Sequence, residues 1–411
     1  MGEIMRNTRK RSGMMFLAAS AMLLSLCLPL ATFGAPSVFP KGEVTINKPL
    51  EIDKGYTLYL SCQVNRVILL DSNGIEVHFW DSPNLAGGMC DNVLPLPGGH
   101  ILVHVGKEPD RRIVELDWDG AVVWEYYNPD FAFLHHDFER EANGNTLILG
   151  SQYRTVPAVA AREIKDDLIV EVDKDGKEVW RWSTADHYGQ LSLSAQARKI
   201  IRDGHQKDFV NDVRDVFHTN SIQILPANAY ASKNSAFKEG NILVSQRNAN
   251  IIFIIDKQTK KIVWQMANQT VGQHQSKMIP KTDMDGKALP GAGNIILFDN
   301  GGEAGFPKVT RFYSSVLEFN PVTQKIAWEY NATMSGQPIR RFFSPFRSST
   351  QRLPNGNTLI LEAEWGRIFE VKKAGGIVWE YINPYCSKDT GVNEVYRVYR
   401  LNLDWASNLA L

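Results

Sequence analysis

Histidines near three strand-length segments are the strongest candidates for catalysis or metal binding. The segment 134–150, LHHDFEREANGNTLILG, places His135 and His136 side by side at the start of a predicted strand. Two further segments begin close to His218 and His274. A neutral imidazole can act as a nucleophile, an acid or base, or a metal ligand. Whether any of these roles applies depends on whether the fold brings the histidines together.

The chain contains an internal repeat that predicts how these segments are arranged. A turn carrying glycine precedes a short apolar run at Gly99, Gly144, Gly240, Gly293 and Gly356, with a weaker copy around Gly55. After each copy, a second pair of runs encloses a polar turn and ends in a tryptophan, namely Trp80, Trp124, Trp180, Trp264, Trp328 and Trp379. Each unit therefore contains four short strands. Six units of this kind predict an all-β fold, a six-bladed β-propeller of four-stranded blades.

The spacing of the repeats gives approximate boundaries. The blades are expected at residues 42–83, 84–128, 129–183, 217–267, 272–331 and 342–384 of a single domain spanning 35–411. The longer interval between the third and fourth blades predicts a helical or loop insertion at 187–216. Residues 385–411 are expected to form a C-terminal extension. The tryptophans are interpreted as packing residues between neighbouring blades.

The first strand of each propeller blade lines the central channel, so its N-terminal end lies at one mouth. Aligned on the glycine turns, the positions that begin these strands are Asp91, His136, Asn220, His274 and Ser348. His218 lies two residues before Asn220 and, with a strand period of two, should share its side. His135 should face the other way and be structural. The repeat thus predicts a polar pocket formed by His136, His218, Asn220 and His274.

Two further groups of residues are expected near this pocket. Arg247 follows the second strand of the fourth unit, and its planar guanidinium would suit the oxygens of an oxyanion. Arg347, Phe342 and Phe346 precede the first strand of the sixth unit and are predicted to bind an aromatic substrate.

Such a pocket suits two chemistries. Three histidines could hold zinc or copper, although His136, His218 and His274 form no H-x-H or H-x-x-x-H pair with one another. Alternatively, one imidazole attacks sulfur or phosphorus, the arginine and asparagine neutralise the equatorial oxygens, and a second histidine protonates the leaving oxygen. A non-catalytic propeller that binds a ligand or partner, and a quinone-dependent enzyme, also remain open.

The ordered motifs HHDFEREANGNTLIL, FHTNSIQILP, ILVSQRNANIIFIID and GQHQSKMIP…GNIILFDNGG resemble the bacterial aryl-sulfate sulfotransferase family. This resemblance implies a secreted propeller that transfers sulfuryl groups between phenols without a nucleotide donor and without a cofactor or resident metal. It implies that His274 is the nucleophile that becomes sulfohistidine, and that His136, His218, Asn220 and Arg247 bind the sulfuryl group. The chain departs from the family in lacking its extra N-terminal β domain and a close cysteine pair, which leaves a homodimer open.

The bulk composition restricts partners and location. Lysine plus arginine equals aspartate plus glutamate at 45 each, so nothing indicates binding to nucleic acid. Residues 1–34 have a basic start, an apolar stretch and small residues before a cleavage point after Gly34, which predicts a signal peptide and a periplasmic or secreted protein. A membrane anchor is the alternative, because about 20 apolar residues can span a bilayer. Cys62, Cys90 and Cys386 allow one disulfide and one spare thiol.

Overall fold

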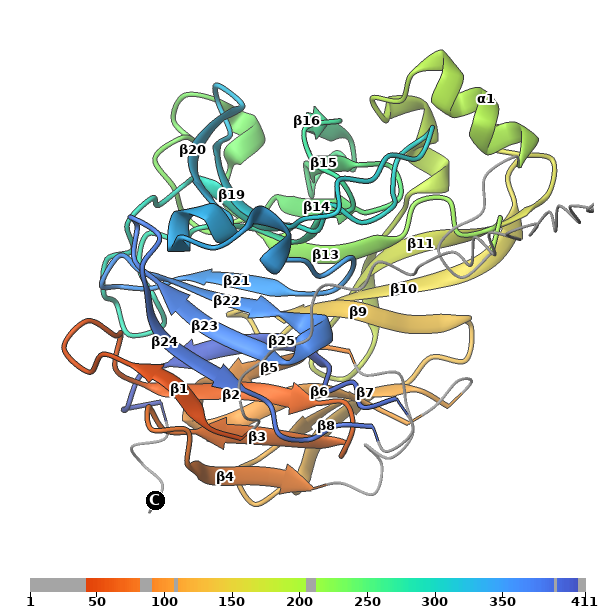
Figure 1. The fold of residues 1–411 in the computed structure, drawn as a ribbon. Helices are drawn as coiled ribbons and strands as arrows, with labels where there is room; N and C mark the ends of the chain where they lie inside the picture. The colour runs from red at the N-terminus through yellow and green to blue at the C-terminus, as the bar shows by residue number, and fades with distance from the viewer. Residues whose placement is uncertain (1–41, 82–90, 107–109, 205–211, 388–389, 406–411) are drawn as a thin grey trace, which may run out of the picture. The chain divides into compact units, whose positions relative to one another are not determined.

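The computed structural model describes residues 42–81, 91–106, 110–204, 212–387 and 390–405 (Figure 1). The predicted signal segment and Cys90 lie outside these residues. All of the described residues belong to one compact unit. In the described part of the chain, no helix is long and apolar enough to cross a membrane.

The strands form six antiparallel sheets, each of which is one blade. From the inner to the outer strand, the first blade is β25 (Val395–Leu401), β2 (Tyr56–Ser61), β3 (Arg66–Leu70) and β4 (Glu76–Asp81). The second is β5 (Val93–Leu96), β6 (His100–Val105), β7 (Arg112–Leu116) and β8 (Val122–Tyr126), and the third is β9 (Phe133–Arg140), β10 (Thr146–Thr155), β11 (Glu163–Val172) and β12 (Glu178–Ser183).

The fourth blade is β13 (Thr219–Ile224), β14 (Ile242–Gln246), β15 (Ile251–Ile255) and β16 (Ile262–Ala267). The fifth is β17 (His274–Met278), β18 (Ile295–Asp299), β19 (Ser315–Asn320) and β20 (Lys325–Tyr330). The sixth is β21 (Ser349–Arg352), β22 (Thr358–Glu362), β23 (Arg367–Val371) and β24 (Ile377–Ile382), with β1 (Val44–Asn47) added at its outer edge. The prediction of a six-bladed propeller with four-stranded blades is confirmed.

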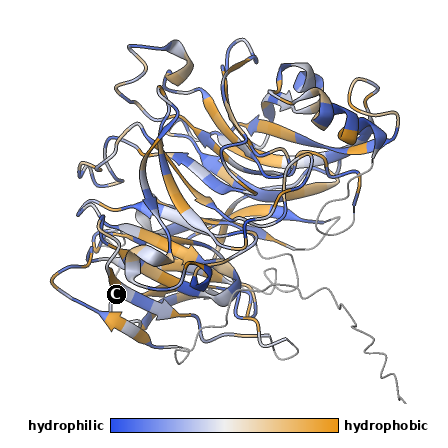
Figure 2. Ribbon diagram, turned by 45° about the horizontal axis from the view of Figure 1, so that its top comes forward, coloured by the Kyte–Doolittle hydropathy of each residue, from blue (hydrophilic) through white to orange (hydrophobic). Residues whose placement is uncertain are grey.

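The core lies between the blades. In the described part of the chain, six clusters of buried apolar side chains each join two neighbouring blades. Middle strands such as β15, IIFII, are buried on both faces and therefore read as continuous apolar runs. Figure 2 shows hydrophobic residues concentrated on the strands, whereas many of the connections between them are hydrophilic.

The tight turns between the third and fourth strands have a local cause. In the turn after β11, the Asp173 carboxylate accepts hydrogen bonds from the backbone N–H groups of Asp175 and Lys177, at 3.0 and 2.9 Å. Gly176 adopts a φ of 80°, which a residue without Cβ reaches at little cost. The same pattern recurs at Asp71 in the first blade. These turns end each outer hairpin at a fixed length.

The repeated tryptophans connect the blades through hydrogen bonds as well as packing. Each donates its indole N–H to a backbone carbonyl in the outer turn of the next blade. The pairs are Trp80–Asp117, Trp124–Lys174, Trp180–Lys257, Trp264–Pro321, Trp328–Lys373 and Trp379–Ser72, at 2.8–3.0 Å. The last pair connects the sixth blade to the first. The tryptophans therefore form a continuous ring of contacts around the propeller.

The two chain ends complete blades in a way that the repeat did not predict. Residues 385–411 were expected to lie outside the blades, but they contain β25, which pairs with β2 and supplies the inner strand of the first blade. Residues 42–83 were expected to form the first blade. β2, β3 and β4 from this range do so, whereas β1 pairs with β24 of the sixth blade. The sequence VYRVYRL of β25 carries no glycine turn and no tryptophan, so the repeat pattern did not reveal it.

The insertion between the third and fourth blades contains the 3₁₀ helix η3 (Ala185–Gln190) and the helix α1 (Ala195–Asp203). Ser194 caps the N-terminus of α1, and Gly204 ends it in a left-handed conformation. Ile201 and Tyr188 pack on the apolar cluster between these two blades. The helical part of the prediction for 187–216 is therefore confirmed, within the described residues.

Cys62 is disulfide-bonded, whereas Cys386 is a free and exposed thiol. Cys386 is therefore not part of that disulfide.

Candidate active site

The predicted histidines lie in or next to neighbouring inner strands. His136 is in β9, His218 immediately precedes β13, and His274 is the first residue of β17. The rings of His136 and His218 meet edge to face with centroids 5.0 Å apart. Both His218 and Arg247 influence the ionisation of His274 electrostatically. The structure therefore brings together residues from the third, fourth and fifth blades, as the repeat alignment predicted.

Each of these strand ends departs from regular β geometry. Irregular register marks β9 around His136, β13 around Asn220 and β17 around Gln275. His136, His218 and Gln275 have φ angles of 61°, 53° and 48°, in the left-handed region that side chains with a Cβ rarely adopt. Bulges re-aim side chains, so the strict period of two used to place His218 does not hold here. Strained residues of this kind concentrate at functional sites.

The hydrogen bonds around His274 determine its tautomer. Nδ1 lies 2.8 Å from Oδ1 of Asn300 and 3.1 Å from the carbonyl of Gly272. The Asn300 amide nitrogen donates to the carbonyls of Ser344 and Arg347, which fixes its oxygen toward His274. Because both neighbours of Nδ1 are acceptors, the proton is on Nδ1. Nε2 therefore carries the lone pair, and it accepts a hydrogen bond from the Arg347 backbone N–H at 3.2 Å.

His274 is also held in its neutral form. Its side chain is buried, and burial followed by the positive charge of Arg247 lowers its pKa well below the ordinary value for histidine. A neutral imidazole with an available lone pair is the form that can attack an electrophile. The Nε2 lone pair of His274 therefore belongs to a buried, neutral imidazole.

His218 is paired with a carboxylate. Its Nδ1 lies 2.7 Å from Oδ2 of Asp215, and both side chains are buried. Burial opposes ionisation of Asp215, but His218 and then Lys165 outweigh it and lower the pKa of the carboxyl. A carboxylate at this position fixes the proton on Nδ1 and stabilises the imidazolium when the ring is protonated. His218 is therefore arranged to exchange protons through Nε2.

His136 is supported from behind by its neighbour. Its Nδ1 lies 2.7 Å from Nδ1 of His135, and Nε2 of His135 faces the Asp167 carboxylate at 3.6 Å. The carboxylate favours a proton on Nε2 of His135, so His136 donates from Nδ1 and keeps a lone pair on Nε2. Burial, followed by His135 and His218, lowers the pKa of His136 well below its ordinary value. His135 is buried next to His136.

Arg247 and Asn220 lie within the same buried region. The Arg247 backbone N–H donates to the carbonyl of His218, and its guanidinium donates to Asn248. The Asn220 amide donates to the carbonyl of Gln273, next to His274, at 2.8 Å. Among the described residues, Oδ1 of Asn220 has no hydrogen-bond partner although the side chain is fully buried. Such an orphan acceptor is uncommon in a folded protein.

The residues expected to bind an aromatic group behave differently from one another. Arg347 contacts His274 through its backbone N–H, and its side chain forms an ion pair with Glu394. The half-buried ring of Phe346 lies 5.5 Å from the Arg347 guanidinium carbon. Phe342 is only 1% exposed and packs on Phe298 within the core. The prediction that Phe342 contacts substrate is therefore wrong, because its ring fills the space between the fifth and sixth blades.

Three site residues were missed in the sequence. Asn300 follows β18 in the quoted motif FDNGG, and Asp215 precedes His218 by three residues, but neither occupies the repeat position that was aligned. Tyr396 belongs to β25, and its ring centroid lies 6.1 Å from that of His136. Its hydroxyl is buried and, within the described residues, has no hydrogen-bond partner. Of these three residues, only Asn300 lies in a sequence motif that could have identified it, FDNGG.

Comparison with protein families finds a match over much of the chain. The family model described as Arylsulfotransferase (ASST) matches residues 130–384. No curated protein matches.

Similar solved structures are distant in sequence. A protein of unknown function from Bacteroides caccae is 12% identical, with a TM-score of 0.52 and coverage of 84% of this chain and 98% of the other. The WD40 β-propeller domain of Doa1 is 10% identical, with a TM-score of 0.42 and coverage of 90% and 97%. The family match spans more than half of the chain and includes His136, Asn300 and the residues arranged between them. The chain belongs to the arylsulfotransferase (ASST) family.

Proposed function

We propose that this protein transfers a sulfuryl group from a phenolic sulfate ester to an acceptor phenol through a sulfohistidine at His274. Family membership suggests an arylsulfotransferase and hence a transferase enzyme. The observation that supports the finer proposal most strongly is the Asn300–His274 hydrogen bond, which leaves the Nε2 lone pair of a neutral imidazole available.

In the first step, Nε2 of His274 attacks the sulfur of the donor ester. A bond forms between Nε2 and sulfur, and the bond from sulfur to the aryl oxygen breaks with its electron pair on oxygen. Protonated His218 transfers its Nε2 proton to that oxygen, and a neutral phenol leaves. The Asn300 carbonyl oxygen stabilises the Nδ1–H of the sulfated ring, whose positive charge develops during attack.

In the second step, the acceptor phenol gives its proton to the neutral His218. Its oxygen attacks sulfur, and the sulfur–Nε2 bond breaks with the electron pair returning to His274. No net proton is consumed over the two steps. Asp215 stabilises the His218 imidazolium formed in this half-reaction.

The sulfuryl oxygens are negatively charged throughout, so they need donors. Arg247 supplies positive charge beside His274, and His136 completes the buried wall against His218. The Arg347 backbone N–H now holds Nε2 at 3.2 Å, and we propose that it turns to a sulfuryl oxygen when sulfur occupies the lone pair.

The direct test uses 4-nitrophenyl sulfate as donor and a second phenol as acceptor, without any nucleotide. We expect nitrophenol release that depends on acceptor, with the parallel double-reciprocal lines of a ping-pong reaction. His274→Ala should reduce turnover by about 10⁴-fold or more, and Arg247→Ala by about 10²-fold or more. His100→Gln, which alters a histidine paired with Glu115, is the matched control and should retain full activity. Absence of transfer in the folded protein would refute the proposal.

We also propose that the protein acts in the periplasm or outside the cell, after removal of residues 1–34. The basic and apolar layout of that segment supports this. Fractionation of expressing cells, with the mass of the mature N-terminus, tests it. Retention of the intact segment in the cytoplasm would contradict it.

A further inference from the structure

The central channel is blocked part of the way along by a buried ionic cluster. Asp137 on β9 is its centre, and it accepts hydrogen bonds from residues of four other blades. These are Asn92 at 2.9 Å, the Ile222 backbone N–H at 3.0 Å, Lys277 at 3.2 Å and Arg397 at 2.7 Å. Asp137 and Arg397 are both about 1% exposed. The cluster separates the histidines at the start of the inner strands from the space at their other ends.

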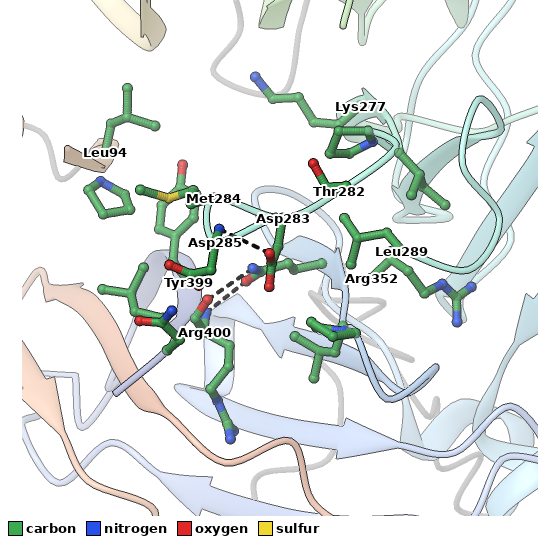
Figure 3. Close-up of a pocket in the computed structure, with 18 of the residues that line it drawn as sticks. Leu94, Lys277, Thr282, Asp283, Met284, Asp285, Leu289, Arg352, Tyr399 and Arg400 are labelled. Atoms are coloured by element: carbon green, nitrogen blue, oxygen red, sulfur yellow. Dashed lines mark hydrogen bonds between the residues drawn. The ribbon is translucent and has the colours of Figure 1, made fainter. Parts of the chain in front are cut away.

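That other space is a pocket with a cavity volume of about 620 Å³ (Figure 3). Its wall includes the C-terminal parts of all six inner strands, such as Leu94 of β5 and Leu401 of β25. The connection after β17 contributes Met284 and Leu289 to the wall. Most of the wall is apolar, and the volume suits a small organic molecule. Nothing in the proposed sulfuryl transfer uses this pocket.

Three of the cations that line the pocket lie next to carboxylates. Arg352 pairs with Glu318, Arg400 lies 3.5 Å from Glu370, and Lys277 is shared between Asp137 and Glu139. Figure 3 shows the guanidinium ends of Arg352 and Arg400 directed away from the labelled apolar residues. These three cations therefore already have anionic partners, and Lys287 is a further cation of the lining.

Glu139 is a carboxyl group of the pocket whose cation partner is shared with other groups. Its side chain is 24% exposed and lies on β9, two residues after the Asp137 cluster centre. The nearest cation, Lys277, lies 3.6 Å away and is also engaged by Asp137 and by the Ile222 carbonyl. Burial raises the pKa of Glu139 to about 7, and Lys277 only partly opposes this. A cation brought next to this carboxyl would favour its ionised form.

The surroundings of Glu139 also suit a cation with an apolar body. Asp283 and Asp285 line the same pocket and add negative charge, and Asp283 is bonded only to backbone donors of its own turn among the described contacts. Tyr399 and Trp405 supply aromatic surface to the wall, and aromatic faces attract organic cations. We propose that this pocket is a second ligand site, which binds a small aryl- or alkylammonium compound through an ion pair with Glu139.

The test measures binding of 2-phenylethylammonium to the full protein by calorimetry at pH 7.5, with 2-phenylethanol and 3-phenylpropionate for comparison. The ammonium should bind at least about tenfold more tightly than either analogue, which corresponds to at least ~1.4 kcal/mol. Glu139→Gln should remove this preference. The control is Glu141→Gln, because Glu141 lines the same pocket but is paired with Lys257, and it should change the affinity less than threefold.

The decision does not depend on the Glu139 variant alone, because ammonium binding can also be measured with two proteins that keep Glu139. In the wild type, affinity for the ammonium should fall as pH decreases through 7, because protonation of Glu139 removes the negative charge. The His274→Ala protein should bind the ammonium normally, so the result does not depend on sulfuryl transfer. Equal binding of the neutral analogue, tighter binding of the carboxylate, or no binding at millimolar concentration would each overturn the proposal.

Discussion

Asn300 determines which nitrogen of His274 is available to react. Its amide orientation is fixed by two backbone carbonyls, so its oxygen faces Nδ1. The same logic applies to Asp215 and His218 on the neighbouring strand. In both cases a buried acceptor holds the Nδ1 proton, which leaves Nε2 for the proposed chemistry. The two histidines still differ, because Nδ1 faces an amide oxygen in His274 and a carboxylate oxygen in His218.

The role of Asn300 predicts distinct effects of two substitutions. Asn300→Ala removes the acceptor and should lower the transfer rate by about 10²-fold while His274 keeps its neutral form. Asn300→Asp places a negative charge beside the ring and should raise the pKa of His274, so its activity should be lost at acidic pH where the wild type is still active. The measurement is the pH profile of transfer for the three proteins. Identical profiles would show that Asn300 is only structural.

Buried neutral histidines also make stability depend on pH. The pKa values of His104, His136 and His274 are all lowered by burial. Below the ordinary value of about 6.5, the unfolded chain binds protons that the folded chain excludes, so stability falls as pH decreases.

Denaturant unfolding between pH 7.5 and 5 should show this loss, at up to about 1.4 kcal/mol per pH unit for each such group. Glu139, whose pKa is raised, opposes it in the same range because the folded state binds its proton more tightly. His274→Gln should give a shallower pH dependence than the wild type. An unchanged slope in a folded His274→Gln protein would mean that His274 is not kept neutral.

At the level of elements, the blades could be predicted from the sequence but the strand ends could not. The glycine turns and tryptophans repeat at regular spacing, so they reveal the strands and the order in which the candidate site residues follow around the propeller. The bulges at His136, Asn220 and Gln275 leave no such pattern. They arise where contacts with other strands disrupt the regular alternation of side chains between the two faces of a strand. One example is the backbone N–H of His136, which donates to the Asp91 carboxylate. Phe342 was misplaced for a related reason, because nothing in its segment distinguishes a core ring from a substrate-facing one.

The tryptophan ring predicts a graded effect on stability. Trp379 is fully buried and joins the sixth blade to the first through Ser72. Trp379→Phe removes this hydrogen bond and part of the packing, and should lower the free energy of unfolding by about 1–3 kcal/mol. Trp124, whose hydrogen bond to Lys174 is exposed, is the matched comparison. Trp124→Phe should lower the free energy of unfolding by less than Trp379→Phe does. Equal effects in chemical unfolding experiments would contradict this account.

At the level of the whole molecule, the propeller closes through its C-terminus. β25 pairs with β2 and brings Tyr396 and Arg397 to the channel from a segment that the repeat left unassigned. Arg397 then contacts Asp137 of the third blade. Closure therefore contributes both to the fold and to the cluster that divides the channel. A sequence read through repeats alone misses this, because a closing strand need not resemble the strands that it joins.

Removal of residues 394–411 should prevent stable folding, because the first blade loses its inner strand and Asp137 loses its buried cation. Removal of 406–411 alone keeps β25 and the Trp405–Leu96 hydrogen bond, so that chain should unfold at the wild-type temperature. Circular dichroism melting of the two shortened chains tests this. Cooperative melting of the chain that ends at residue 393 would show that β25 is dispensable.

The central claim is that His274 carries the sulfuryl group between donor and acceptor. The most direct measurement is the mass of the peptide containing His274 after the protein is mixed with 4-nitrophenyl sulfate and no acceptor, then quenched at alkaline pH. The peptide should gain the mass of one SO₃ group, the gain should disappear when a phenol is added, and the Asn300→Ala protein should form the adduct more slowly. Steady turnover with no modification at His274, or modification at another histidine, would contradict the account.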